Sequence, residues 1–128
     1  FEKTEMTVEH KCVEGWSHIV TWGGTKFSEF AEQYRPMLGG LPEFVSLVTP
    51  DGDYYVGMDL PSMLHPQTML TYELQGELLS SEHGAPLRLT TPNKYGIKNL
   101  KRIGTIRFTN EQPDDYWGDR GYDWYAQL

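Results

Sequence analysis

The sequence is poor in cysteine, in long apolar runs and in positive charge. Cys12 is the only cysteine in 128 residues, so no internal disulfide can form and a disulfide-stapled scaffold is excluded. No apolar run approaches the roughly 18 residues of a membrane-spanning helix, so we expect no membrane span in this chain. The 11 Lys and Arg against 18 Asp and Glu give a net charge of -7, which argues against a nucleic-acid partner.

Several common signatures of catalysis are also missing. The sequence has no nucleophile elbow, no phosphate-binding P-loop, no dinucleotide GxGxxG and no Cys-x-x-Cys-His motif for haem attachment. Aromatic residues, in contrast, are plentiful, with 8 Tyr, 5 Phe and 4 Trp. A chain of this length and composition is enough for one domain with a real hydrophobic core.

Short β-rich runs alternate with turns that contain glycine and proline along most of the chain. We expect strands at 4–12, 19–22, 44–48, 54–58, 69–74, 87–91 and 103–108, a single helical turn at 60–64 and irregular structure over 114–128. Gly23 and Gly24 are expected to close the second strand. Helical spacing then predicts a helix capped by Thr25 or Ser28 and ended by Pro36. The result is an α+β fold of mainly antiparallel or mixed sheets with few helices.

Cys12 has two interpretations from the residues alone. Free cysteine is among the most buried residue types, which favours a core thiol. Thiolate is also a ligand for soft metal centres. A zinc site from His10, Cys12 and His18 lacks an evident fourth ligand, which structural zinc requires.

Two segments in the second half of the chain carry groups that suit an anion. The loop His83-Gly84-Ala85-Pro86-Leu87-Arg88 is either a turn with a surface arginine or an anion clamp, since arginine binds phosphate in bidentate fashion. Five of the 11 basic residues follow soon after, namely Lys94, Lys98, Lys101, Arg102 and Arg107. In an acidic chain this cluster is either a specific anion site or an ordinary solvated face.

Three segments, taken together in this order, resemble the sulfite oxidase family of molybdopterin-binding oxidoreductases. They are Cys-Val-Glu-Gly-Trp-Ser at 12–17, His-Gly-Ala-Pro-Leu-Arg-Leu at 83–89 and Lys-Tyr-Gly-Ile-Lys-Asn-Leu-Lys at 94–101. The resemblance covers residues 8–108 and is nearest to the bacterial branch that includes the periplasmic methionine sulfoxide reductase. It implies a sulfite oxidase-like fold and a molybdenum-molybdopterin cofactor.

The resemblance also implies roles for individual residues. Cys12 matches the catalytic cysteine whose thiolate binds molybdenum, and the dithiolene of the pterin supplies two further sulfurs. His83 stands where relatives often have Asn, and Arg88 matches the arginine that binds the cofactor. The complete set of implied cofactor contacts is Thr49, His83, Arg88, Lys98, Asn99, Leu100 and Lys101, with Lys94 as an added charge partner for the phosphate.

The implied activity is oxygen-atom transfer, with reduction of a small S-oxide or N-oxide. Sulfite-oxidising relatives have an Arg-rich pocket near the cysteine, where this chain has Glu14, Trp16 and Ser17. Trp16 and Trp22 are candidates to wall an apolar pocket for such a substrate. The other function class is a non-catalytic module that binds an anion, a pterin-like ligand or a protein.

Electrons would come from a separate donor, such as a haem-containing membrane protein, because the chain has no haem motif of its own. By the same resemblance we expect a periplasmic or otherwise extracytoplasmic location, with the cytoplasm as the alternative. Relatives carry a substantial stretch before the cysteine, whereas here eleven residues precede Cys12. We therefore expect residues 1–128 to form a single molybdopterin-binding domain that is incomplete at its amino end.

Overall fold

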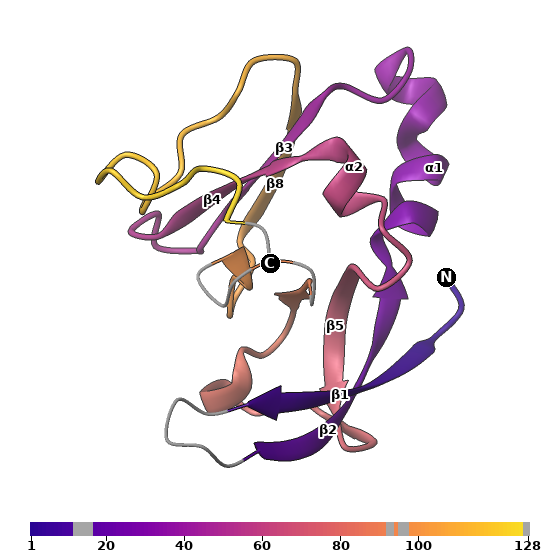
Figure 1. Cartoon of the computed structure of the whole chain (residues 1–128). Helices are drawn as coiled ribbons and strands as arrows, with labels where there is room; N and C mark the ends of the chain where they lie inside the picture. Colours follow the sequence, from indigo (N-terminus) through magenta and orange to yellow (C-terminus); the bar gives the residue numbers. More distant parts are fainter. Residues whose placement is uncertain (12–16, 92–93, 95–97, 127–128) are drawn as a thin grey trace.

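The described part of the chain folds into two antiparallel sheets with helices at their junction (Figure 1). The computed structural model describes residues 1–11, 17–91, 94 and 98–126, and for 10, 11, 17 and 18 only the backbone. These residues contain no helix long and apolar enough to cross a membrane. The predicted α+β class with mainly antiparallel sheets is confirmed.

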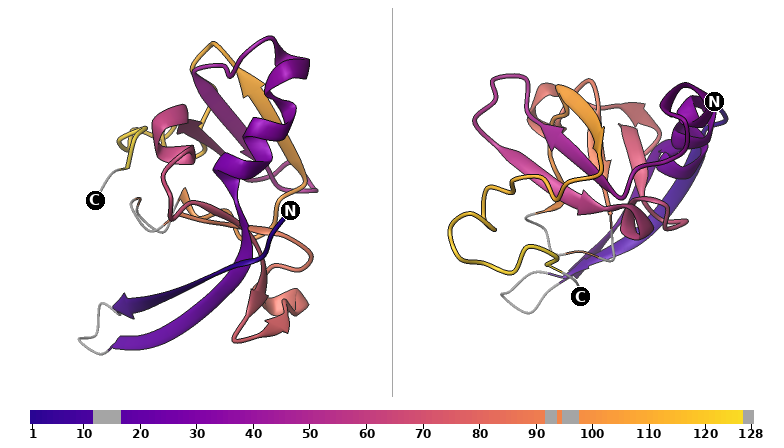
Figure 2. Two further views of the ribbon diagram at one scale, coloured as in Figure 1. Left: turned by 90° about the vertical axis from the view of Figure 1, so that its right-hand side faces the viewer. Right: turned by 90° about the horizontal axis from the view of Figure 1, so that it is seen from above.

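The larger sheet has the order β1-β2-β5-β6, with β7 also paired to β5. Its strands are β1 (Thr4–Lys11), β2 (Ser17–Lys26), β5 (Met69–Leu74), β6 (Glu77–Leu78) and β7 (Arg88–Thr90). The β1–β2 hairpin extends away from the rest of the chain (Figure 2). Because Arg88 of β7 pairs with Thr71 of β5, and Thr71 pairs with Gly24, Arg88 lies across the sheet from the last residues of β2.

The smaller sheet has the order β4-β3-β8, formed by β4 (Tyr55–Asp59), β3 (Phe44–Val48) and β8 (Thr105–Thr109). Alternation along β3 buries Val45 and Leu47 and turns Ser46 to the opposite face. Two helices, α1 (Phe27–Leu38) and α2 (Leu60–Met63), and the 3₁₀ turn η1 (Ser81–His83) complete the elements. The main core joins α1 and α2 with the two sheets through Phe27, Ala31, Val45, Leu47, Val56, Met58, Met63, Leu70, Leu89 and Leu100.

The predicted end of the second strand and the predicted helix cap are wrong. The strand predicted at 19–22 does not close at Gly23 and Gly24, because β2 continues to Lys26 and takes up the glycines as a register shift against β5. The strand then passes straight into α1, so neither Thr25 nor Ser28 caps the helix, and its N-cap residue Lys26 makes no side-chain cap bond.

The predicted end of the helix is also wrong. Pro36 lies inside α1, which continues to Leu38. Proline removes one N–H donor, but so close to the helix end this costs only one hydrogen bond. The helix stops at Gly39, whose φ of 70° is the left-handed conformation in which helices commonly end.

Candidate functional site

The segments 83–89 and 98–103 lie side by side in the structure, although they are separate in the sequence. The backbone N–H of Leu89 donates to the carbonyl of Leu100 at 2.8 Å, and that of Ile103 donates to Leu87 at 2.9 Å. The guanidinium of Arg102 donates to the carbonyls of Ala85 and Ser81 at 2.8 and 2.6 Å. The structure therefore brings most of the predicted cofactor contacts into one region.

Gly84 is the residue that allows this close approach. Its φ is +101°, and a Cβ placed there would lie 1.9 Å from the carbonyl oxygen of Lys101. A side chain at this position would therefore be strained by the backbone conformation and would collide with the neighbouring segment. The glycine in the 83–88 loop is explained by packing between the two segments.

The side chain of Arg88 combines an aromatic contact with incomplete hydrogen bonding. Its guanidinium carbon lies 4.6 Å from the ring centre of Trp22, and its Nη1 donates to the carbonyl of His83 at 3.1 Å. Its Nε is buried and finds no hydrogen-bond acceptor among the residues that the structure describes. Burial lowers the pKa of the guanidinium, and no carboxylate in the described ranges opposes this shift.

A partly buried arginine with a buried N–H that lacks an acceptor is costly for a protein unless an anion compensates it. A phosphate or another anionic group of a cofactor would supply the missing acceptor in bidentate geometry. Trp22 is only 6% exposed, and it forms the platform beneath the guanidinium. The residues around Arg88 thus fit an anionic group.

Other predicted contacts are engaged mainly within the protein. The hydroxyl of Thr49 donates to the carboxylate of Asp51 at 2.6 Å and accepts the N–H of Tyr54, so it closes the β3–β4 turn. The Nδ1 of His83 lies 2.8 Å from the hydroxyl of Ser80. The carbonyl of Val48, next to Thr49, accepts the N–H of Gly104, which places this turn beside the 98–103 segment.

The side chains of Asn99 and Leu100 in the stretch Asn99–Lys101 are engaged within the protein. The side chain of Asn99 accepts the N–H of Thr91 at 2.6 Å and donates to the carbonyl of Thr91 at 3.3 Å. Leu100 is buried in the main core, and Lys101 is exposed. Asn99 therefore ties this stretch to Thr91, and the side chain of Lys101 is left accessible to solvent.

The lysines Lys94 and Lys98 are buried and paired. Lys98 Nζ lies 2.7 Å from the carboxylate of Asp115, and Lys94 Nζ lies 2.9 Å from that of Asp59. Burial lowers the pKa of Lys98, and the hydrogen bond and charge of Asp115 partly oppose that shift. The carboxylate partners of these two lysines were not predicted from the sequence.

Cys12, the predicted molybdenum ligand, lies outside the described residues, as do the side chains of His10 and His18. The thiolate and zinc hypotheses for this segment therefore stay predictions. Within the ranges that the structure covers, no three His, Cys, Asp or Glu side chains are grouped so that they could hold a metal ion.

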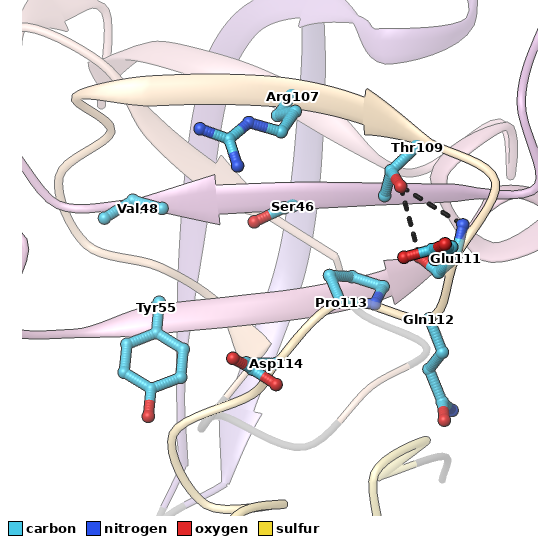
Figure 3. Close-up of a pocket in the computed structure, with 9 residues that line it drawn as sticks. All are labelled: Ser46, Val48, Tyr55, Arg107, Thr109, Glu111, Gln112, Pro113 and Asp114. Carbon is cyan, nitrogen blue, oxygen red and sulfur yellow. Dashed lines mark hydrogen bonds between the residues drawn. The ribbon is translucent and has the colours of Figure 1, made fainter.

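A shallow groove of about 450 Å³ lies on the outer face of the β4-β3-β8 sheet (Figure 3). Arg107 on β8, Ser46 on β3 and Tyr55 on β4 line it, with Asp114 at its edge. None of the predicted cofactor contacts is among its lining residues. The groove is therefore a feature separate from the region around Arg88.

The two-sheet fold and the half-buried Arg88, whose Nε has no acceptor among the described residues, define a domain suited to an anionic ligand. Residues 1–117 match the family described as the oxidoreductase molybdopterin binding domain, and the chain belongs to this family. The resemblance to molybdopterin-binding oxidoreductases is thereby confirmed.

The chain is also similar to individual known proteins of this kind in sequence and in fold. The chain is 38% identical over 124 residues to subunit YedZ1 of Azospira oryzae, covering 97% of this chain and 46% of that protein. It is 34% identical over 125 residues to the protein-methionine-sulfoxide reductase catalytic subunit MsrP of Burkholderia mallei, covering 88% and 38%. The crystal structure of the sulfane dehydrogenase SoxCD from Paracoccus pantotrophus has the same fold, with a TM-score of 0.71 at 18% identity, over 88% of this chain and 33% of that one. The chain spans less than half the length of these curated relatives.

Proposed function

We propose that this chain binds a molybdenum-molybdopterin cofactor and serves in an oxidoreductase that reduces a small S-oxide or N-oxide. Membership of the molybdopterin-binding family supports the cofactor. The similarity to MsrP, a protein-methionine-sulfoxide reductase catalytic subunit, favours an S-oxide over an N-oxide. The non-catalytic binding module remains the other candidate on this fold.

The observation that carries the proposal is the unsatisfied Nε of Arg88 above Trp22. Burial lowers the pKa of this guanidinium, and the part of the chain that the structure describes supplies no counter-charge, so an anion that reached it would gain a strong, charge-assisted contact. The pterin cofactor carries such an anion in its phosphate. Arg88 is thus the residue that we assign to the phosphate end of the cofactor.

The remaining residues take smaller roles in this proposal. Lys101 is exposed next to Arg88's segment and supplies a second cation, while the backbone of Asn99 and Leu100 frames the site. Thr49 and His83 orient their loops by the hydrogen bonds described above. Cys12 is proposed as the thiolate ligand, since soft sulfur ligands suit such a metal. When bound, the cofactor supplies the two-electron transfer of an oxygen atom, and the protein binds and orients it.

The proposal includes an electron donor on another protein and an extracytoplasmic location. The sequence has no haem attachment motif, which favours an external donor such as a haem-containing membrane protein. The location rests on the resemblance alone and stays a prediction.

Molybdenum per chain tests the proposal. The chain is produced in a host that makes the cofactor, and metal is counted by elemental mass spectrometry in the wild type and in Cys12→Ser. We expect a ratio near one in the wild type, together with reduction of methionine sulfoxide by a reduced dye. The Cys12→Ser protein should lose this activity. A wild-type protein that is folded and free of molybdenum would contradict the proposal and favour the binding module.

A further inference from the structure

The irregular segment 113–125, which we call the strap, runs along the free edge of β4 (Figure 1). The N–H of Tyr116 donates to the carbonyl of Tyr55 at 2.9 Å, and the N–H of Gly57 donates to the carboxylate of Asp115 at 2.9 Å. Exposed strand edges are open to unwanted pairing, and the strap satisfies this one. The strap is therefore fastened to the fold although it has no regular secondary structure.

The strap also holds Lys98. The ammonium of Lys98 lies 2.7 Å from Asp115 Oδ1, 2.7 Å from the carbonyl of Gly57, and 4.5 Å from the ring centre of Trp124. The side chains of Lys98 and Asp115 are only 1% and 3% exposed. Lysine has three N–H donors, and here the ammonium has two oxygen acceptors and one aromatic ring face beside it. This lysine is committed to the strap and to β4.

Gly57 makes the arrangement possible. A Cβ at position 57 would lie 2.6 Å from Cζ2 of Trp124, so only glycine lets the indole rest on the strand. The indole N–H donates to the carbonyl of Pro113 at 2.9 Å, which ties the two ends of the strap together. Trp124 therefore closes the strap over the Lys98–Asp115 pair.

A second lysine repeats the pattern at the far end of the strap. Lys94 Nζ lies 2.9 Å from the carboxylate of Asp59 and 2.6 Å from the carbonyl of Tyr125. Its side chain is 1% exposed. Both buried lysines of the 94–101 segment thus bind the strap, whereas Arg88 on the neighbouring β7 does not.

We propose that the strap positions the Asn99–Lys101 stretch through Lys98, and that Asp115 and Trp124 are positioning residues for the cofactor site. Lys98 precedes this stretch, whose Leu100 carbonyl pairs with Leu89, next to Arg88. Fastened at Lys98 on one side and at Arg102 on the other, the stretch is held against β7. The role in cofactor binding rests on the proposed function, and it replaces a direct contact of Lys98 with phosphate.

The test compares Asp115→Asn and Trp124→Phe with Asp114→Asn in the full chain. Asp114 is the exposed neighbour of Asp115 and serves as the matched control. Hydrogen exchange is followed in peptides covering 88–91 and 98–103, with a peptide from α1 as the internal reference. Molybdenum per chain is measured on the same samples after gel filtration.

We expect Asp115→Asn to speed exchange in both peptides by roughly tenfold or more, with α1 unchanged. Trp124→Phe should change exchange in the same direction and by less. Retention of molybdenum should fall by roughly tenfold in Asp115→Asn, as for other residues that orient ligands. Asp114→Asn should change neither quantity.

Two results would overturn the proposal. Unchanged exchange in 98–103 for both strap variants would show that the strap does not hold this stretch. If Lys98 is instead a phosphate ligand that Asp115 merely occupies, Asp115→Asn frees it, and molybdenum retention stays equal or rises. A wild-type chain without molybdenum would contradict the proposed function alone, since the exchange comparison still decides whether the strap positions the stretch.

Discussion

Arg88 and Lys98 are two cations of the same region with opposite surroundings. Lys98 has a carboxylate at 2.7 Å and a carbonyl at the same distance. Arg88 has one carbonyl, an aromatic face and a buried Nε with no acceptor in the described part of the chain. Burial lowers the pKa of both groups, and among the described residues a neighbouring carboxylate opposes the shift for Lys98 but not for Arg88.

The different surroundings of Lys98 and Arg88 distinguish a cation that stabilises the fold from a cation that is available to a ligand. A buried charge that the fold has already paired contributes to the folded state, and removing its partner is expensive. A desolvated charge left without a counter-charge is the kind of group that marks a ligand site. Sequence position alone does not make this distinction, because both residues lie in motif segments of the family.

The largest effect on stability is expected from Asp115→Ala, which removes the partner of the buried Lys98. Lys98 would stay buried without its counter-charge, so the free energy of unfolding should fall by about 3–5 kcal/mol. Urea denaturation of the cofactor-free chain measures it, with Asp114→Ala as the control. A loss below about 1 kcal/mol would mean that the pair behaves as a surface ion pair.

A small effect on stability is expected from Arg88→Met, which replaces the other cation of the comparison. The variant loses a hydrogen bond to His83 and the stacking on Trp22, but it also removes a desolvated charge. These contributions oppose each other, so the free energy of unfolding should change by less than about 1 kcal/mol. The same urea titration applies, and a loss as large as that of Asp115→Ala would show that Arg88 is already satisfied within the fold.

The smallest effect on stability is expected at acidic pH from Asp59, the carboxylate that pairs with Lys94. Burial raises the pKa of Asp59, but hydrogen bonds from Ser62 and Lys94 outweigh it and set the pKa below its ordinary value of 3.8. A carboxylate with a lowered pKa stabilises the fold above its unfolded pKa, and this stability is lost as the pH falls through the folded pKa.

The melting temperature should therefore fall as the pH drops below about 4, and it should fall less steeply in Asp59→Asn. Thermal unfolding followed by circular dichroism between neutral and acidic pH measures this. Parallel pH profiles for the two proteins would contradict a role for Asp59.

Most strands could be predicted because period-two alternation and turn residues are local signals. The run 69–74 matches β5, and 44–48 matches β3. The errors lie where tertiary pairing overrides a local rule. Gly23 and Gly24 are kept in β2 by the pairing with β5, and Pro36 is tolerated near the end of α1.

The site could be predicted only in part. The Gly-containing loop before Arg88 was a visible signal, and the structure places it against 98–103. The partners of Lys98 could not be foreseen, because Asp115 and Trp124 come from a segment without periodicity. A buried lysine requires a carboxylate, but the sequence does not say which one. The role of Cys12 remains a prediction.

The central claim is that the unpaired cation, Arg88, holds the anionic cofactor. Its most direct test is molybdenum per chain in Arg88→Met beside Arg107→Met, in which an exposed arginine of the separate groove is replaced. Both are produced with the wild type in a host that makes the cofactor. We predict a ratio near one for the wild type and for Arg107→Met, and near zero for a folded Arg88→Met. Equal molybdenum in the two variants would contradict the account.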